Sequence, residues 1–281
     1  MSRALAVYHG VFGRVTLYQL DRELATHAHR EGHLVFYVSG KHGGMAVEGV
    51  RHDLDRASGA AVSPWQPHSF HPGDLENGSL FLVMYIRPEW FLEMSKHARL
   101  GLNFGSSLIE MSAPVRQLVH QTSQLLLDDA CGELIQACVF ELTQESYNQS
   151  WASSSSAAQD EMPVAMLRDF RIRNSMKLMK SRLGEGESIL LDSIARGAGI
   201  SRPHFFKLFK ENVGLTPNIY LNTLRMETAI ERLTQSSDAV TSIGLDLGFS
   251  SQASFTRFFA SNVGIPPSDY RRVAQLSPQT G

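Results

Sequence analysis

The chain has 281 residues, of which 43% are hydrophobic and 19% are charged. This balance is ordinary for a globular protein, and it excludes a disordered chain, a collagen-like rod and a coiled-coil rod. Because one domain usually takes about 100–200 residues, the length predicts two domains. The sequence lacks both the roughly 20-residue apolar run of a membrane-spanning helix and a secretion signal at its start. We therefore expect a cytoplasmic protein with no membrane partner.

Charge is distributed unequally along the chain. Residues 1–162 contain 11 Lys and Arg against 18 Asp and Glu, a net charge of −7. Residues 163–281 contain 15 against 10, a net charge of +5. Ten of the 11 histidines lie in the acidic part. The basic part therefore favours a polyanionic partner, and the acidic part favours a different chemistry that uses histidine.

The first 110 residues consist of short apolar runs, such as LVFYV and LFLVMYI, broken by Gly, Pro and Asp. This pattern predicts closely spaced strands in a sandwich or a small barrel. Residues 111–149 place apolar side chains three and four positions apart, which predicts a helical hairpin. Its stripes are too extensive for a barrel to cover alone, so we expect the hairpin to form a homodimer. The Ser-rich residues 150–162 have the composition of a linker.

An internal repeat is the most specific pattern in the chain. SRPHFFKLFKENVGLTPNIY begins at Ser201, and SQASFTRFFASNVGIPPSDY begins at Ser251, 50 residues later. A short helical segment ends in Gly199 ahead of the first copy and in Gly248 ahead of the second. Helix, glycine turn, serine cap and second helix together predict a helix-turn-helix. The two predicted units span about residues 189–214 and 238–264 of a DNA-binding domain formed by residues 163–281.

The second helix of each unit has a buried and an outward face. Phe205 and Phe209 mark the buried stripe of the first copy, and Phe255 and Phe259 mark that of the second. Outward Arg and Lys suit guanine, Gln suits adenine, and Phe and Thr suit thymine methyl groups. An outward Phe206 argues against the alternative, a merely solvated face. The predicted DNA-reading residues are Arg202, Phe206, Lys207, Lys210, Gln252, Thr256 and Arg257.

The stretch IGLDLGFSSQASFTRFFASNVGIPPSDYRR, Ile243 to Arg272, resembles the AraC/XylS family of bacterial transcription activators. The resemblance implies two helix-turn-helix units joined by a long helix, with double-stranded DNA as partner and RNA polymerase as a possible second one. Gly244 departs from the family, which usually has Ala there. We expect this glycine to loosen its helix, at about 1 kcal/mol relative to Ala.

The first half resembles, less specifically, the cupin-type effector-binding and dimerisation domain of the same family. His27 and His29 match the H-x-H pair of metal cupins, His68 fits the later histidine, and His33 stands where a Glu is usual. Four imidazoles could bind a divalent transition metal. The resemblance to regulators instead favours a small polar or anionic effector, with no metal and no cofactor. The predicted effector-binding residues are His27, His29, His33, Tyr37, Trp65 and His68.

Together these features predict an α+β protein of two domains, a cupin-like β-barrel with a helical hairpin followed by an all-α double helix-turn-helix. The predicted function is a sequence-specific transcriptional regulator, expected to be an activator, that a small molecule controls. Two alternatives stay open: a metal-binding cupin, as sensor or enzyme, fused to a DNA-binding domain, and an architectural DNA-binding protein with no enclosed pocket. The sequence contains no nucleophile–base constellation, phosphate loop or paired CxxC, so we expect no enzyme.

Overall fold

The computed structural model describes residues 2–73, 76, 78–95, 102–128, 131–153, 169–186 and 189–276. The chain divides into two compact units, one of Met1–Asp160 with Ala260–Gly281 and one of Glu161–Phe259. Most of the predicted linker, residues 154–162, lies outside the described residues. Within the described part of the chain, every helix is too short or too polar to cross a membrane.

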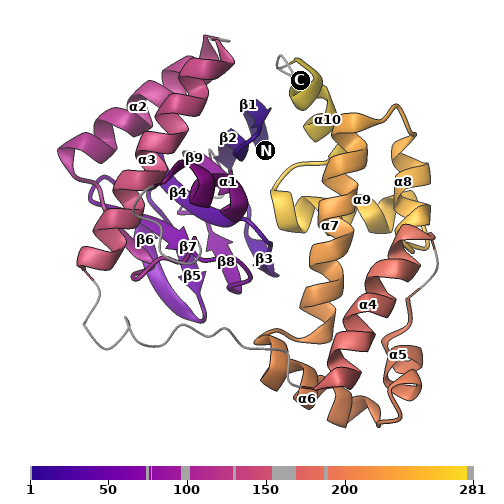
Figure 1. The fold of residues 1–281 in the computed structure, drawn as a ribbon. Helices are drawn as coiled ribbons and strands as arrows, with labels where there is room; N and C mark the ends of the chain where they lie inside the picture. The colour runs from indigo at the N-terminus through magenta and orange to yellow at the C-terminus, as the bar shows by residue number, and fades with distance from the viewer. Residues whose placement is uncertain are drawn as a thin grey trace. The chain divides into compact units, whose positions relative to one another are not determined.

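Ten strands and three helices make up the first 152 residues as described (Figure 1). The strands are β1 Arg3–Gly10, β2 Gly13–Leu20, β3 Leu24–His27, β4 Gly32–Ser39, β5 Gly43–Val47, β6 Val50–Leu54, β7 Ser58–Val62, β8 His68–His71, β9 Ser79–Ile86 and β10 Leu108–Glu110. The helices are α1 Pro88–Met94, α2 Ala113–Leu127 and α3 Gly132–Ala152.

The described strands form two antiparallel sheets. One has the order β1-β2-β9-β4-β7-β10, and the other has the order β3-β8-β5-β6. The predicted α+β class with a β-rich first part and a helical hairpin is confirmed, but the predicted closed barrel is corrected to two separate sheets. Alternating apolar runs indicate strands without showing whether the outer strands pair, and here β1 and β10 remain edges of the larger sheet within the described residues.

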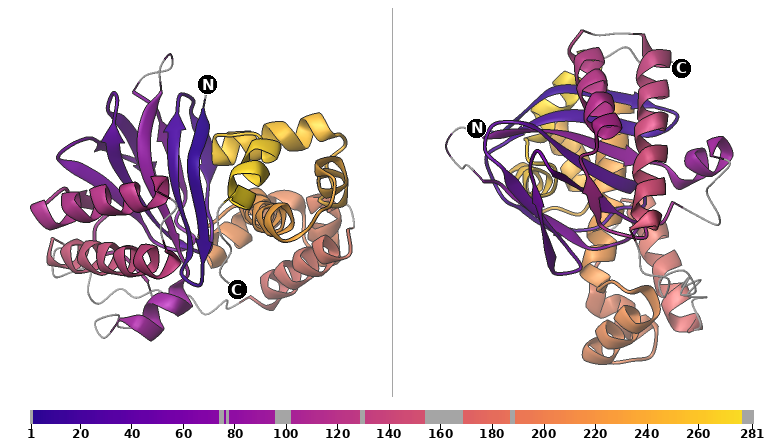
Figure 2. Two further views of the ribbon diagram at one scale, coloured as in Figure 1. Left: turned by 90° about the horizontal axis from the view of Figure 1, so that it is seen from above. Right: turned by 90° about the vertical axis from the view of Figure 1, so that its left-hand side faces the viewer.

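The central strands of the six-stranded sheet are buried on both faces. On β4, Leu34 and Phe36 belong to a core shared with the helices, whereas the side chain of Tyr37 packs against Phe81. Because side chains alternate along a strand, His33 lies on the same face as Tyr37, away from the hairpin. Figure 2 shows α2 and α3 lying along the opposite face of this sheet. The alternation therefore separates an apolar core under the hairpin from a second, more polar interior.

The hairpin helices turn most of their apolar stripes into this core. The Ser112 side chain caps α2 by accepting a hydrogen bond from the Val115 backbone N–H. The stripe residues Val115, Val119, Leu126, Ile135, Val139 and Leu142 are buried. Leu127 and Leu134 remain 52% and 55% exposed, near the turn between the helices. Among the described residues of the two helices, Leu127 and Leu134 are the exposed large apolar side chains that a partner could cover, and the homodimer stays a prediction.

Helices make up the rest of the described chain. They are α4 Phe170–Gly184, α5 Leu191–Gly197, α6 Arg202–Val213, α7 Pro217–Gln235, α8 Val240–Asp246, α9 Gln252–Val263 and α10 Pro267–Leu276. The long α7 follows α6 and precedes α8, as the resemblance implies. Gly214 closes α6 in the left-handed conformation at φ 79°, and Thr216 caps α7 by accepting from the Ile219 backbone N–H.

Candidate nucleic-acid interface and ligand site

The two helix-turn-helix units repeat the same turn. The Ile200 backbone N–H donates to the Ala195 carbonyl at 3.2 Å, and the Phe249 N–H donates to the Gly244 carbonyl at 3.0 Å. Between them, Gly199 and Gly248 adopt φ of 71° and 82°, which a side chain would disfavour. The sequence repeat is therefore a repeat of backbone geometry.

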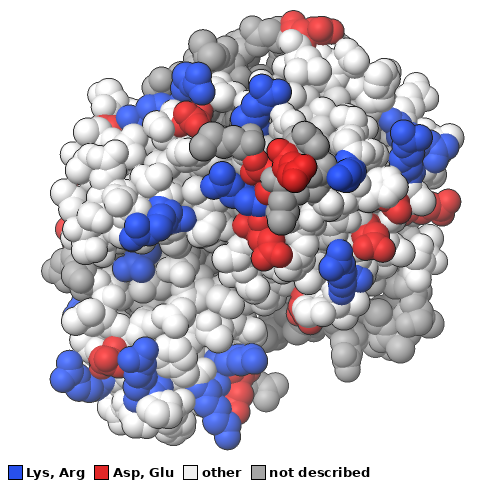
Figure 3. All heavy atoms as spheres, turned by 180° about the vertical axis from the view of Figure 1, so that it is seen from behind, with Lys and Arg blue, Asp and Glu red and all other residues white. Residues whose placement is uncertain are grey.

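Packing in each unit fixes which face of the second helix is outward. Phe205 and Phe209 of α6, and Phe255 and Phe259 of α9, are 0% exposed. The seven predicted reading residues lie on the remaining surface of the same helices. Arg202, Lys207, Lys210, Gln252 and Arg257 are exposed, and Phe206 and Thr256 are half-buried. In Figure 3, basic side chains with acidic ones among them gather at the lower left, over the helices α4 to α6.

The first residue of each reading helix is held by the helix before it. The Arg202 guanidinium forms an ion pair with Asp192 at 3.2 Å and lies 5.2 Å over the Phe206 ring. In the second unit, the Gln252 side-chain oxygen accepts from the Thr241 hydroxyl at 2.5 Å. The sequence interpretation missed Asp192 and Thr241. Asp192 is the second residue of α5, and Thr241 is the second residue of α8. An alignment of these two helices, which open the two helix-turn-helix units, would have found both residues.

Lys207 has a weaker partner on its own helix. Its ammonium lies 3.9 Å from the Glu211 carboxylate, one turn further along α6, and both side chains are more than half exposed. Ion pairs of this kind contribute little, about 0.3–0.5 kcal/mol on a helix. Lys207 can therefore exchange Glu211 for a base or a phosphate at little cost.

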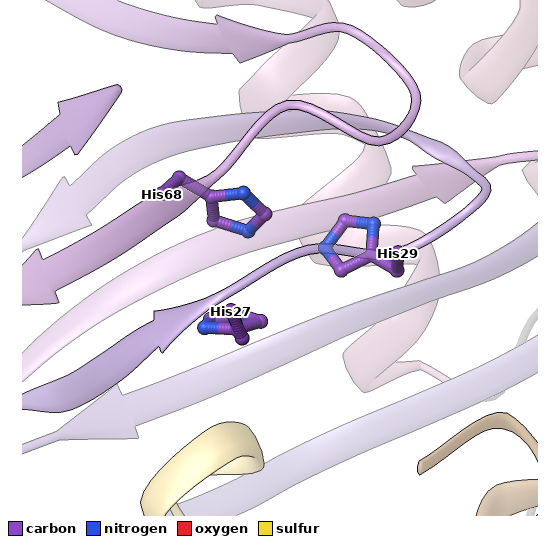
Figure 4. Close-up of side chains that lie close together, drawn as sticks. All are labelled: His27, His29 and His68. Atoms are coloured by element: carbon purple, nitrogen blue, oxygen red, sulfur yellow. The ribbon is translucent and has the colours of Figure 1, made fainter. Parts of the chain in front are cut away.

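In the β-rich part of the chain, strand pairing brings the predicted histidines together. His27 at the end of β3 lies directly opposite His68 at the start of β8, and their ring centroids are 4.3 Å apart. His29 follows β3, 4.7 Å from His68, and His33 of β4 is 5.0 Å from His68. Figure 4 shows the His29 and His68 rings pointing toward one another, with His27 beside them. The structure thus collects all four histidines that the sequence singled out.

Backbone carbonyls orient three of these rings. Nδ1 lies 2.7 Å from the Ala25 carbonyl oxygen in His27, 3.2 Å from that of Glu31 in His29, and 2.9 Å from that of Gln66 in His68. A carbonyl oxygen can only accept, so each Nδ1 is the protonated nitrogen. A neutral imidazole has one N–H, and each Nε2 therefore presents a lone pair.

His33 extends this pattern. Its Nδ1 lies 3.2 Å from Nε2 of His68, which is an acceptor, so His33 donates there and its own Nε2 is a second lone pair. The Nε2 atoms of His29 and His33 are buried without a hydrogen-bond partner. Burial lowers the pKa of all four histidines, and those of His29, His33 and His68 fall well below the usual 6.5. The cluster is neutral near pH 7.

One buried cation lies nearby, on the far side of an aromatic ring. The Tyr85 ring stacks on His33, with centroids 4.5 Å apart, and the Arg14 guanidinium lies 3.6 Å over the same ring. In the sheet, Tyr85 stands between Arg14 of β2 and His33 of β4. The Glu31 carboxylate lies 4.0 Å from His29. The histidines therefore face a tyrosine on one side and a carboxylate on the other.

The other two predicted effector residues lie at the margin of the cluster. Tyr37 donates its hydroxyl to the Gly40 carbonyl at 2.6 Å and packs against His42 and Phe81. The Trp65 backbone N–H donates to the His29 carbonyl at 2.8 Å, and Trp65 adopts φ 66°, a strained value for this residue. Trp65 thus holds the His29 loop through its backbone, whereas Tyr85 contacts the rings of His29 and His33.

The cavity beside the histidines is small, about 20 Å³. His27, His33, His68 and Tyr85 line it together with apolar side chains such as Val35, Met45 and Phe70. A space of this size holds about one water-sized particle.

Comparison with known proteins agrees with this architecture. A family of helix-turn-helix domains matches residues 194–273. The probable transcription factor PqrA of Proteus vulgaris is 32% identical over 100 residues, which are 36% of this chain and 82% of PqrA. An uncharacterized regulator of the helix-turn-helix type from Haemophilus influenzae is 31% identical over 86 residues, and that match spans 31% of this chain but only 29% of the regulator.

The fold of the whole chain also has a solved counterpart. The crystal structure of ToxT from Vibrio cholerae with bound unsaturated fatty acid matches 97% of this chain and 99% of its own, with a TM-score of 0.56 and 15% identity. The repeated turns and outward basic faces define a DNA-binding protein with two helix-turn-helix units. The chain belongs to the AraC/XylS family of transcriptional regulators.

Proposed function

We propose that this regulator recognises a specific DNA sequence with both α6 and α9, one in each of two successive major-groove segments. The observation that carries the proposal is the repeated turn geometry with an exposed polar face on each second helix. Major-groove segments on one side of DNA recur every 10–10.5 base pairs or so, which sets the expected spacing of the two contacts. The proposed reading residues are Arg202, Phe206, Lys207, Lys210, Gln252, Thr256 and Arg257.

Site selection from random DNA tests this proposal. The full chain should enrich a sequence with two conserved blocks about 10 base pairs apart, and footprinting should protect both blocks. Enrichment of a single block, or the absence of any enriched sequence, would contradict recognition by two helices.

We further propose that a ligand at the histidine cluster controls DNA binding and that the protein acts as a cytoplasmic activator. A ligand can shift a regulator only if it binds one of its states more tightly, and the small pocket beside the histidines of the β-rich part offers a place for such differential contacts. Two buried lone pairs without partners, on His29 and His33, support a binding role over a purely structural one. The cavity also disfavours the architectural alternative, which would need no enclosed site.

A further inference from the structure

The chemistry of the histidine cluster identifies the class of its occupant. Three Nε2 lone pairs, those of His27, His29 and His68, are candidate ligand atoms, and the three residues offer atoms within 4.8 Å of one another. Each ring is fixed from behind by a hydrogen bond from Nδ1 to a backbone carbonyl. Histidines that bind metals almost always donate their second nitrogen in this way, which orients the ring and raises the basicity of the ligand nitrogen.

The volume of the cavity favours an ion over an organic effector as the ligand. Pockets for organic ligands usually have about 300–1,000 Å³, whereas the space beside these histidines is about 20 Å³. The volume suits a single ion next to His27 and His68, which line this space, and His29 is not a lining residue but contacts the His68 ring. Tetrahedral zinc takes nitrogen ligands at about 2.0–2.1 Å and so about 3.3 Å from one another, which means that the ligand atoms, now within 4.8 Å, need to approach by up to roughly 1.5 Å through ring rotation and small shifts of their loops.

The charges and hydrogen-bonding groups around the site favour a cation over an anion as the ligand. An anionic effector would bring acceptor oxygens against Nε2 atoms that are themselves acceptors, including the unpartnered Nε2 of His29. The buried Arg14 guanidinium lies against the Tyr85 ring, which separates it from His33. The Glu31 carboxylate, near His29, favours positive charge. These observations favour a cation over the polar or anionic ligand that the sequence predicts, and the identity of the ligand stays a prediction.

We propose that His27, His29 and His68 bind one divalent transition-metal ion through their Nε2 atoms, and that this ion is the controlling ligand of the regulator. A set of three imidazoles suits zinc, nickel, copper and iron. The regulatory half of the proposal rests on the proposed function, and the metal site does not. His33 lies outside the set of three, and in the metal-free chain its Nδ1–H occupies the lone pair of His68.

Titration of the full chain with Co²⁺, after removal of metals with a chelator, tests the site. Visible absorption of cobalt bound by nitrogen should saturate at one ion per chain, and Zn²⁺ should displace it. His27→Gln, His29→Gln and His68→Gln should each weaken binding by more than the roughly 10–100-fold that loss of a hydrogen-bond partner behind a ligand costs. The matched control is His120→Gln on the exposed face of α2, which should bind as the wild type does.

Circular dichroism separates loss of the site from loss of the fold. His27 is only half-buried, so His27→Gln should keep the wild-type spectrum and still lose cobalt. Wild-type protein that gives no saturable cobalt absorption would overturn the metal site, as would undiminished binding by a folded His27→Gln variant.

DNA binding with and without Zn²⁺ tests the regulatory half. Zn²⁺ should change the affinity of the wild type for its selected site and leave folded His27→Gln unchanged. Metal binding without any change in DNA affinity would overturn regulation by the ion. If the protein selects no DNA sequence, the proposed function fails, whereas the cobalt result for the metal site is unaffected.

Discussion

Gly244 is the position where the chain departs from its family, and its surroundings predict what Gly244→Ala does. A Cβ built there would lie 2.8 Å from Cβ of Phe255 and 2.9 Å from its Cγ. These atoms are at the root of the Phe255 side chain, so relief requires movement of α9 itself. Overpacking of a core costs about 1–3 kcal/mol. The gain in helix propensity from Gly to Ala is about 1 kcal/mol. The net expectation is a loss of about 0–2 kcal/mol of unfolding free energy.

A second glycine provides the matched control. Gly197, at the end of α5, has nothing within 4 Å of a built Cβ, so Gly197→Ala should gain up to about 1 kcal/mol from propensity alone. Urea unfolding followed by far-ultraviolet circular dichroism measures both variants. The three tryptophans, Trp65, Trp90 and Trp151, all precede the helix-turn-helix units, so their fluorescence follows the first part of the chain separately.

Two further measurements test whether α8 packs closely on α9 at Gly244. Phe255→Leu keeps Cβ and Cγ, the two atoms nearest the added methyl group, so it should leave most of the penalty of Gly244→Ala in place in a double-mutant cycle. Equal stabilisation by Gly244→Ala and Gly197→Ala would refute the close packing of α8 on α9. In that case Gly244 would only loosen its helix, as the sequence interpretation expected.

Two other predictions concern contacts described above. If the hairpin tip forms the homodimer, Leu127→Glu with Leu134→Glu should shift the full chain from dimer to monomer in sedimentation at about ten micromolar, because each places a charge in an apolar interface; a wild-type monomer would contradict the interface. Asp192→Ala should change stability by less than about 1 kcal/mol, since the ion pair with Arg202 is exposed. The same variant should raise affinity for random DNA and reduce discrimination in fluorescence anisotropy, and unchanged discrimination would show that Asp192 does not position Arg202.

Local patterns in the sequence were enough to predict the helical units. The turn, the serine position and the buried phenylalanines of each unit lie within about 20 residues of one another, and their geometry follows from helix periodicity. Contacts between helices were harder to predict from the sequence. Proximity of Gly244 to Phe255 depends on how closely α8 crosses α9, which residue spacing does not specify.

The histidine cluster illustrates a different limit. The H-x-H spacing identified the residues, but the pairing of β3 with β8 sets His27 opposite His68, 41 residues apart in the chain. The occupant depends on which ring nitrogen is protonated, and backbone carbonyls of Ala25, Glu31 and Gln66 decide this. Sequence alone also overestimated the apolar surface of the hairpin, because the larger sheet covers most of both stripes.

The most direct test of the central claim, recognition by two reading helices, compares Lys207→Ala and Arg257→Ala on the selected site and on random DNA. Each substitution should weaken the selected site by roughly 1–3 kcal/mol more than it weakens random DNA, and base preference should relax in a different block for each variant. Equal losses on both DNAs would contradict the account, because they would reduce both side chains to phosphate contacts.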